Sequence, residues 1–163
     1  MLYSPLAISS MSRLAFLCAS FMLAASLAAA KPNFSGTWLI NLPKSDYGRI
    51  PPPEKLARTV KHSDPNITVS TTQSRQGKES TASFTYTTDG KETSNKTPTG
   101  EVKVMAKWEG DILVVESTRE IQGTEVKQID RWTAAEDGKS MTVVVTLKSP
   151  QGETRMLLFL DKQ

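Results

Sequence analysis

Arg58 and a small set of aromatic side chains have the types and spacing best suited to binding chemistry in this 163-residue chain. Arg58 alternates with Leu56 and Val60 along one run, so a strand there would carry all three to the same, apolar face. Phe84 and Tyr86 share one face of a second run in the same way. A buried cation beside a tyrosine hydroxyl could hold a carboxylate group while an apolar wall holds the rest of a ligand.

Two tryptophans extend this inward-facing set. Trp38 alternates with Gly36 and Ile40, and Trp108 ends an alternating run that includes Val104. The candidate ligand-binding residues are therefore Trp38, Arg58, Phe84, Tyr86 and Trp108. The competing interpretation is that these side chains only fill the interior, as in many small barrels, and that a register slip of one residue turns Arg58 outward.

Catalytic chemistry has less support. His62 is the only histidine and is followed by Ser63 and Asp64, but neighbouring residues of a strand point to opposite faces and do not form a triad. We therefore expect an exposed histidine at the end of a strand. An enzymatic alternative, a lyase or isomerase, would use Tyr47, Tyr86 or His62.

The carboxylates and the potential metal-binding residues also give little support for catalysis. Four carboxylates lie on two neighbouring runs: Glu116, Glu120, Glu125 and Asp130. We expect them to form a solvated face paired with Lys127 and Arg119. With one histidine and one cysteine, Cys18, the chain lacks the clusters that metal sites need. The sequence predicts no catalytic residue, no metal and no cofactor.

Regularly spaced glycines and short alternating runs define the elements that must position these side chains. Glycines from 77 to 152 recur at short intervals among polar residues, which indicates hairpin turns. The runs between them are rich in Thr and Val and predict strands over 35–41, 55–62, 66–74, 79–88, 91–97, 101–108, 111–121, 124–133, 140–148 and 153–161. This pattern predicts an all-β fold: a single antiparallel up-and-down β-barrel of about 8–10 strands.

The first thirty residues have the features of a secretory signal peptide. Arg13 precedes an uncharged apolar run from Leu14 to Leu27, and Ala28-Ala29-Ala30 supplies small residues before a cleavage site. The expected organisation is a cleaved signal peptide at 1–30 and one domain at 31–163, exported to the periplasm or secreted, with no membrane span after cleavage. The mixed charges and net charge of +3 do not predict nucleic-acid binding.

The segment Phe34-Ser35-Gly36-Thr37-Trp38 resembles the opening of the calycins, the superfamily of lipocalins and fatty-acid-binding proteins. The resemblance extends to small exported bacterial lipocalin-like proteins through residues 41–48. It implies a lipocalin-like barrel in which Gly36 and Trp38 form the floor. It also implies a cation packed over the Trp38 ring, for which Arg131 and Arg155 are the candidates.

The chain departs from the calycin pattern in several places. It lacks the Thr-Asp-Tyr motif and the C-terminal helix pattern of lipocalins, and a proline-rich loop replaces the two-helix lid of the fatty-acid-binding proteins. Our leading hypothesis is a barrel that binds a small apolar or amphipathic molecule. The alternatives are a filled barrel that acts as a protein-interaction module, with weak self-association, and the lyase or isomerase above.

Overall fold

A computed structural model describes residues 30–163, and Lys31–Gln163 form one compact unit. The predicted signal peptide lies outside the described residues. Within the described part of the chain, no helix is long and apolar enough to cross a membrane.

Ten antiparallel strands form one sheet, and strands account for 72% of the described residues. Among residues 30–163, the one helical element is a single 3-10 turn. The strands are β1 Gly36–Ile40, β2 Lys55–Ser63, β3 Asn66–Arg75, β4 Lys78–Thr87, β5 Asp89–Thr97, β6 Gly100–Glu109, β7 Ile112–Ile121, β8 Thr124–Ala134, β9 Ser140–Ser149 and β10 Gly152–Lys162. All ten predicted strands are confirmed, with ends within two residues of those expected.

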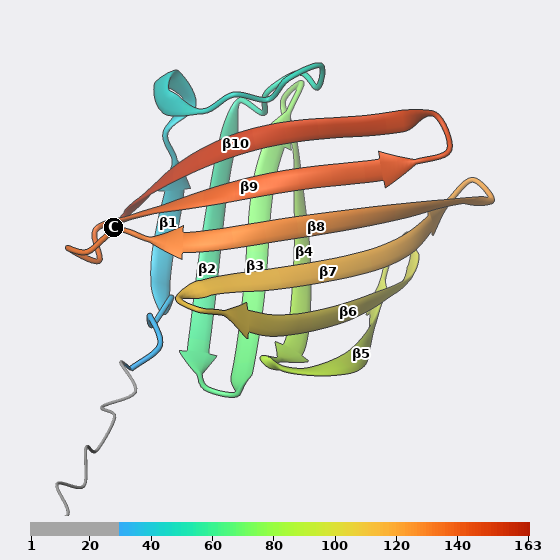
Figure 1. The fold of residues 1–163 in the computed structure, drawn as a ribbon. Helices are drawn as coiled ribbons and strands as arrows, with labels where there is room; N and C mark the ends of the chain where they lie inside the picture. Colours follow the sequence, from blue (N-terminus) through green and yellow to red (C-terminus); the bar gives the residue numbers. More distant parts are fainter. Residues whose placement is uncertain (1–29) are drawn as a thin grey trace, which may run out of the picture. The chain divides into compact units, whose positions relative to one another are not determined.

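The sheet order is β4-β3-β2-β1-β10-β9-β8-β7-β6-β5, so every pair is adjacent in the chain except β1 and β10. Strands β6 to β10 cross in front of β1 to β4 at a steep angle, which makes a nearly closed barrel (Figure 1). The predicted all-β, up-and-down barrel is therefore confirmed.

The barrel closes between β4 and β5 without a backbone ladder. At this seam the backbone N–H of Thr85 donates to the Asn95 side-chain oxygen at 2.8 Å. A side chain thus takes the place of a strand partner at the one junction where the sheet order ends.

Trp38, on β1, is one of the fully buried side chains of the core. Its side chain is 1% exposed, and its indole N–H donates to the Phe34 carbonyl oxygen at 2.9 Å. Gly36 has a φ of +137°, a conformation that L side chains rarely adopt, so glycine is required where the chain enters the floor.

The cation over Trp38 is Lys162, whose Nζ lies 5.2 Å from the ring centroid. The prediction of Arg131 in this role is wrong, because Arg131 lies between the inward-facing Asp130 and Trp132 and therefore points outward. Its guanidinium forms an ion pair with Glu109 at 2.8 Å. Arg155, the other candidate, is exposed.

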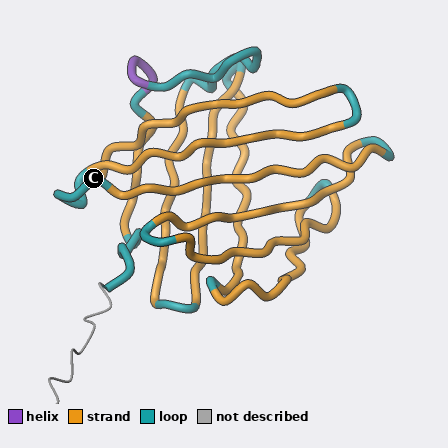
Figure 2. Tube along the Cα trace, in the orientation of Figure 1, coloured by secondary structure: helices purple, strands orange, loops and turns teal. Residues whose placement is uncertain are grey.

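A loop from residue 41 to 54 lies at the opposite, open end (Figure 2). It begins with the 3-10 turn η1 Leu42–Lys44, where the Asn41 side chain accepts from the Lys44 N–H. Farther along, Asp46 and Leu157 exchange two backbone hydrogen bonds, of 2.8 and 2.7 Å. The loop is therefore fastened to β10 beside the mouth of the barrel.

Candidate functional site

The barrel contains a partly open cavity with an inner and an outer compartment. The inner compartment has a volume of about 90 Å³ and the outer one about 580 Å³. The same five side chains line both: Arg58, Thr71, Phe84, Arg119 and Gln128. Because these residues are shared, the two compartments are consecutive parts of one interior space.

Arg58 lies where the compartments meet and is only 8% exposed. Its Nε donates to the Thr71 hydroxyl at 3.2 Å, and its Cζ lies 4.9 Å from the centroid of the Trp132 ring. Its buried Nη1 has no hydrogen-bond partner among the described residues. A buried charged donor without a partner is costly, so this nitrogen is suited to an anionic acceptor from outside the chain.

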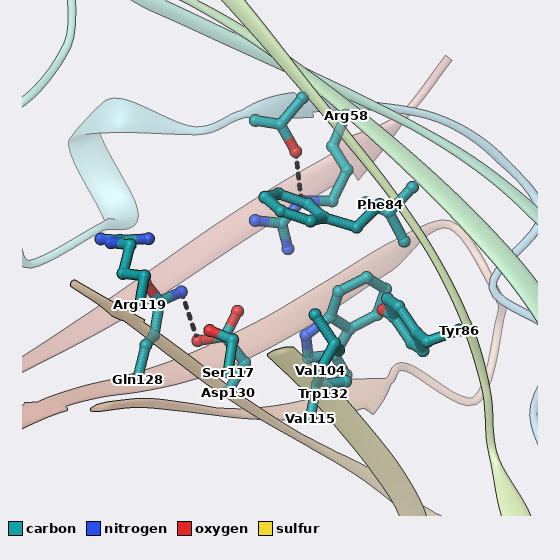
Figure 3. Close-up of a pocket in the computed structure, with 12 residues that line it drawn as sticks. Arg58, Phe84, Tyr86, Val104, Val115, Ser117, Arg119, Gln128, Asp130 and Trp132 are labelled. Carbon is teal, nitrogen blue, oxygen red and sulfur yellow. Dashed lines mark hydrogen bonds between the residues drawn. The ribbon is translucent and has the colours of Figure 1, made fainter. Parts of the chain in front are cut away.

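Asp130 lines the inner compartment from β8 and is 7% exposed (Figure 3). Its Oδ1 accepts a hydrogen bond from the Gln128 amide at 2.9 Å. Burial raises the pKa of this carboxyl, and the positive charge of Arg58 opposes that rise. The inner compartment therefore contains a carboxyl group whose ionised form is less favourable than that of an exposed aspartate.

Two tyrosines border the cavity. Tyr86 lies in the wall of the inner compartment, and burial raises the pKa of its hydroxyl. Tyr47 reaches the outer compartment from the loop at the mouth, its buried hydroxyl has no partner among residues 30–163, and burial raises its pKa too. Both hydroxyls thus keep their protons and can serve as hydrogen-bond donors.

The outer compartment combines an apolar wall with two more cations. The apolar side chains come from β2, β6, β9, β10 and the loop: Ile50, Leu56, Val102, Val145, Leu147, Met156 and Leu158. Arg75 and Arg119 also line it. Three arginines and one carboxylate, Asp130, therefore border the whole cavity, which favours an anionic over a cationic occupant.

The structure brings three of the five predicted ligand-binding residues together. Arg58, Phe84 and Tyr86 line the inner compartment. Trp38 and Trp108 do not border it: Trp38 is part of the floor, and Trp108 stacks with Phe34 outside the cavity, at 6.1 Å between ring centroids. Strand alternation predicted the correct face of the strand for Trp108. Trp108 nevertheless lies near the end of β6, beyond the residues of that strand that line the cavity.

The expectation of an exposed His62 is wrong, since the residue is 9% exposed. Its Nδ1 accepts the Phe34 backbone N–H at 3.2 Å, so the proton of the neutral ring is on Nε2, which faces Asp64 at 3.4 Å. Asp64 also accepts from the Trp108 indole at 3.0 Å. This cluster closes the barrel end, and the cavity residues Tyr47 and Tyr86 do not join His62 in one site.

The sequence analysis did not identify two residues that line the cavity, Asp130 and Arg119. Asp130 was expected on a solvated face but is buried, and Arg119 was expected to pair with surface carboxylates but lines the cavity. Lys127, the other expected partner of these carboxylates, forms an ion pair with Glu116 at 2.6 Å. Two-residue alternation from Trp132 would have placed Asp130 on the inner face.

This arrangement places a buried guanidinium beside an apolar wall. Among residues 30–163, no group of three or more His, Cys, Asp or Glu side chains is placed to hold a metal ion. The side chains that line the cavity offer hydrogen bonding and charge pairing.

Three comparisons relate this chain to known proteins, and only the comparison with solved structures finds matches. No family model and no curated sequence matches the chain. Among solved structures, it is similar to the zebrafish ileal bile acid-binding protein complexed with cholic acid, with 17% identity, a TM-score of 0.54, and coverage of 80% of this chain and 98% of the other.

Two further solved structures are also similar. A secretory abundant heat soluble protein from Ramazzottius varieornatus has 11% identity and a TM-score of 0.60, over 83% of this chain and 98% of the other. The fatty-acid-binding protein 1 of Echinococcus granulosus has 14% identity and a TM-score of 0.52, over 79% and 96%. The chain therefore has the fold of the calycins, the fold that its opening segment resembles.

Proposed function

We propose that this protein is an exported, non-catalytic binding protein that holds a small amphipathic anion, such as a carboxylate with an apolar tail. The observation that carries the proposal is the Arg58 guanidinium, which borders both compartments and whose buried Nη1 has no hydrogen-bond partner among the described residues. The acidic group would bind this nitrogen, and the tail would lie in the apolar outer compartment.

Two of the similar structures are those of a bile acid-binding protein and a fatty-acid-binding protein. Both kinds of ligand carry one carboxylate on an apolar body, which agrees with the charges of this cavity. The protein-interaction alternative assumed a filled barrel, whereas this barrel contains two compartments of about 90 and 580 Å³.

The test is calorimetric titration with decanoate of the wild-type protein, Arg58→Met and the control Arg155→Met. Arg58→Met removes the buried cation and keeps a similar chain length, whereas Arg155 is exposed on the outer face. Loss of a charged hydrogen bond costs about 1.5–3 kcal/mol, which corresponds to about 10- to 150-fold weaker binding. Equal affinity of Arg58→Met and wild type, or no binding of decanoate at all, would contradict the proposal.

Export is proposed from the leader alone. A secreted or periplasmic protein would begin at Lys31 after cleavage following Ala30. Intact-mass analysis of the exported fraction measures this directly, and a mass that retains the first thirty residues would refute cleavage.

A further inference from the structure

The inner compartment contains two opposite charges that do not pair with each other. Arg58 and Asp130 both line this space of about 90 Å³, and both are buried. Each instead has a neutral hydrogen-bond partner: Arg58 donates to Thr71, and Asp130 accepts from Gln128 (Figure 3). The two charges thus interact only through space, and both border the same compartment.

An anion that binds Arg58 changes the surroundings of Asp130 in two ways. It neutralises the cation that supports the aspartate charge, and it adds a second negative charge to the same small compartment. Two carboxylates that share a buried site do not both stay ionised, and one of them takes a proton.

We propose that Asp130 takes up one proton from solvent when an anionic ligand enters the inner compartment, so that ligand binding and protonation are coupled. The inference rests on the proposed function and adds a mode of regulation to it. In the bound state, the protonated carboxyl group can donate a hydrogen bond to the ligand, in addition to the one from Arg58.

Other groups around Asp130 are less able to take this proton. Arg58 on β2 and Arg119 on β7 are guanidinium groups that keep their charge, and Tyr86 on β4 already holds its proton. The paired positions on the adjacent strands β7 and β9 are Val115 and Val145, which do not titrate. Burial also raises the pKa of Asp130 before any ligand binds, which brings the carboxyl nearer to protonation.

Coupling to one proton gives the pH dependence a definite sign. The affinity for an anion increases as pH falls between the Asp130 pKa of the complex and that of the free protein. Within this window the slope approaches about tenfold per pH unit, the limit for one proton. Outside it, the affinity is independent of pH.

The experiment is calorimetric titration of the protein with decanesulfonate, whose charge does not titrate in the range used. Each titration is done in two buffers of different ionisation enthalpy, at about pH 5, 6, 7 and 8, so that the series covers the range above the ordinary aspartate pKa. We expect the observed enthalpy to differ between buffers by up to one proton taken up per ligand. Asp130→Asn should bind without this difference, while Asp64→Asn, altered at the closed end, should keep it.

Each outcome is decisive. Binding with equal enthalpies in both buffers at every pH, or proton uptake that persists in Asp130→Asn, overturns the inference and leaves the proposed function intact. Failure of both decanesulfonate and decanoate to bind overturns the proposed function itself. Asparagine can still accept from Gln128, and an unfolding curve for each variant confirms that the fold is kept.

Discussion

Asp130 is the residue at which ligand binding and stability oppose each other. Burial holds its folded-state pKa above that of the unfolded chain. A group of this kind contributes stability when it is protonated, and that contribution is lost as pH rises through the folded pKa. Above its folded-state pKa, the ionised Asp130 therefore lowers the free energy of unfolding.

We predict that Asp130→Asn is more stable than wild type at neutral pH, and that the difference disappears below about pH 3, where the carboxyl is protonated in both states. Urea unfolding at both pH values measures it. Asp64→Asn is the control with the opposite sign, because hydrogen bonds from Thr88 and Trp108 lower the pKa of Asp64. Its stability contribution is present at neutral pH and lost as pH falls, so a stabilised Asp64→Asn at neutral pH would contradict the argument.

At this scale the sequence predicts side-chain direction well and depth poorly. Alternation placed Arg58 and Tyr86 inside, and both line the cavity. It could not tell that Trp108 lies in the closed end, because depth along the barrel depends on how far each strand is shifted against its neighbours. Asp130 was assigned to the surface from its charge, although its strand position beside Trp132 indicates the interior.

The loop at the mouth is the element most directly placed to control ligand exchange. Tyr47 and Ile50 of this loop line the outer compartment. Gly48, between them, has a φ of +58°, and a Cβ there would lie 2.8 Å from the Arg155 carbonyl oxygen. That oxygen belongs to the backbone of β10, so the loop would have to move away from the strand.

We predict that Gly48→Ala releases decanoate faster than wild type, because the loop no longer packs on β10. Gly77→Ala is the matched control: Gly77 has a similar φ of +68°, but a Cβ there meets nothing within 4 Å. Both variants bear the cost of about 1–3 kcal/mol for an L residue at positive φ. Stopped-flow displacement measures the rates, and equal rates for the two variants would show that the loop does not limit release.

Most of the elements are predictable because their signals are local. Each hairpin needs a turn glycine, and each strand needs alternation, and both are visible within about ten residues of sequence. The seam between β4 and β5 is not predictable in this way, since a missing ladder depends on how the whole sheet curves. The Asn95 side chain that bridges this seam to Thr85 has no distinctive sequence signal.

On the scale of the whole molecule, the two ends of the barrel have separate tasks. The open end carries the cavity, the arginines and the loop. The closed end holds Trp38, Phe34 and His62 in a buried cluster, with Phe34 and His62 stacked at 6.2 Å between ring centroids. Substitutions at the closed end should therefore change stability without changing ligand affinity.

His62→Phe tests this separation. The variant keeps an aromatic ring against Phe34 but removes the Nδ1 that accepts the buried Phe34 N–H. An unsatisfied buried donor costs about 1–3 kcal/mol, so the free energy of unfolding should fall by that amount and the Phe34 amide should exchange its hydrogen faster. Decanoate affinity should match wild type, because His62 lies outside both compartments. A loss of affinity with unchanged stability would mean that the closed end shapes the binding site and that the two tasks are not separate.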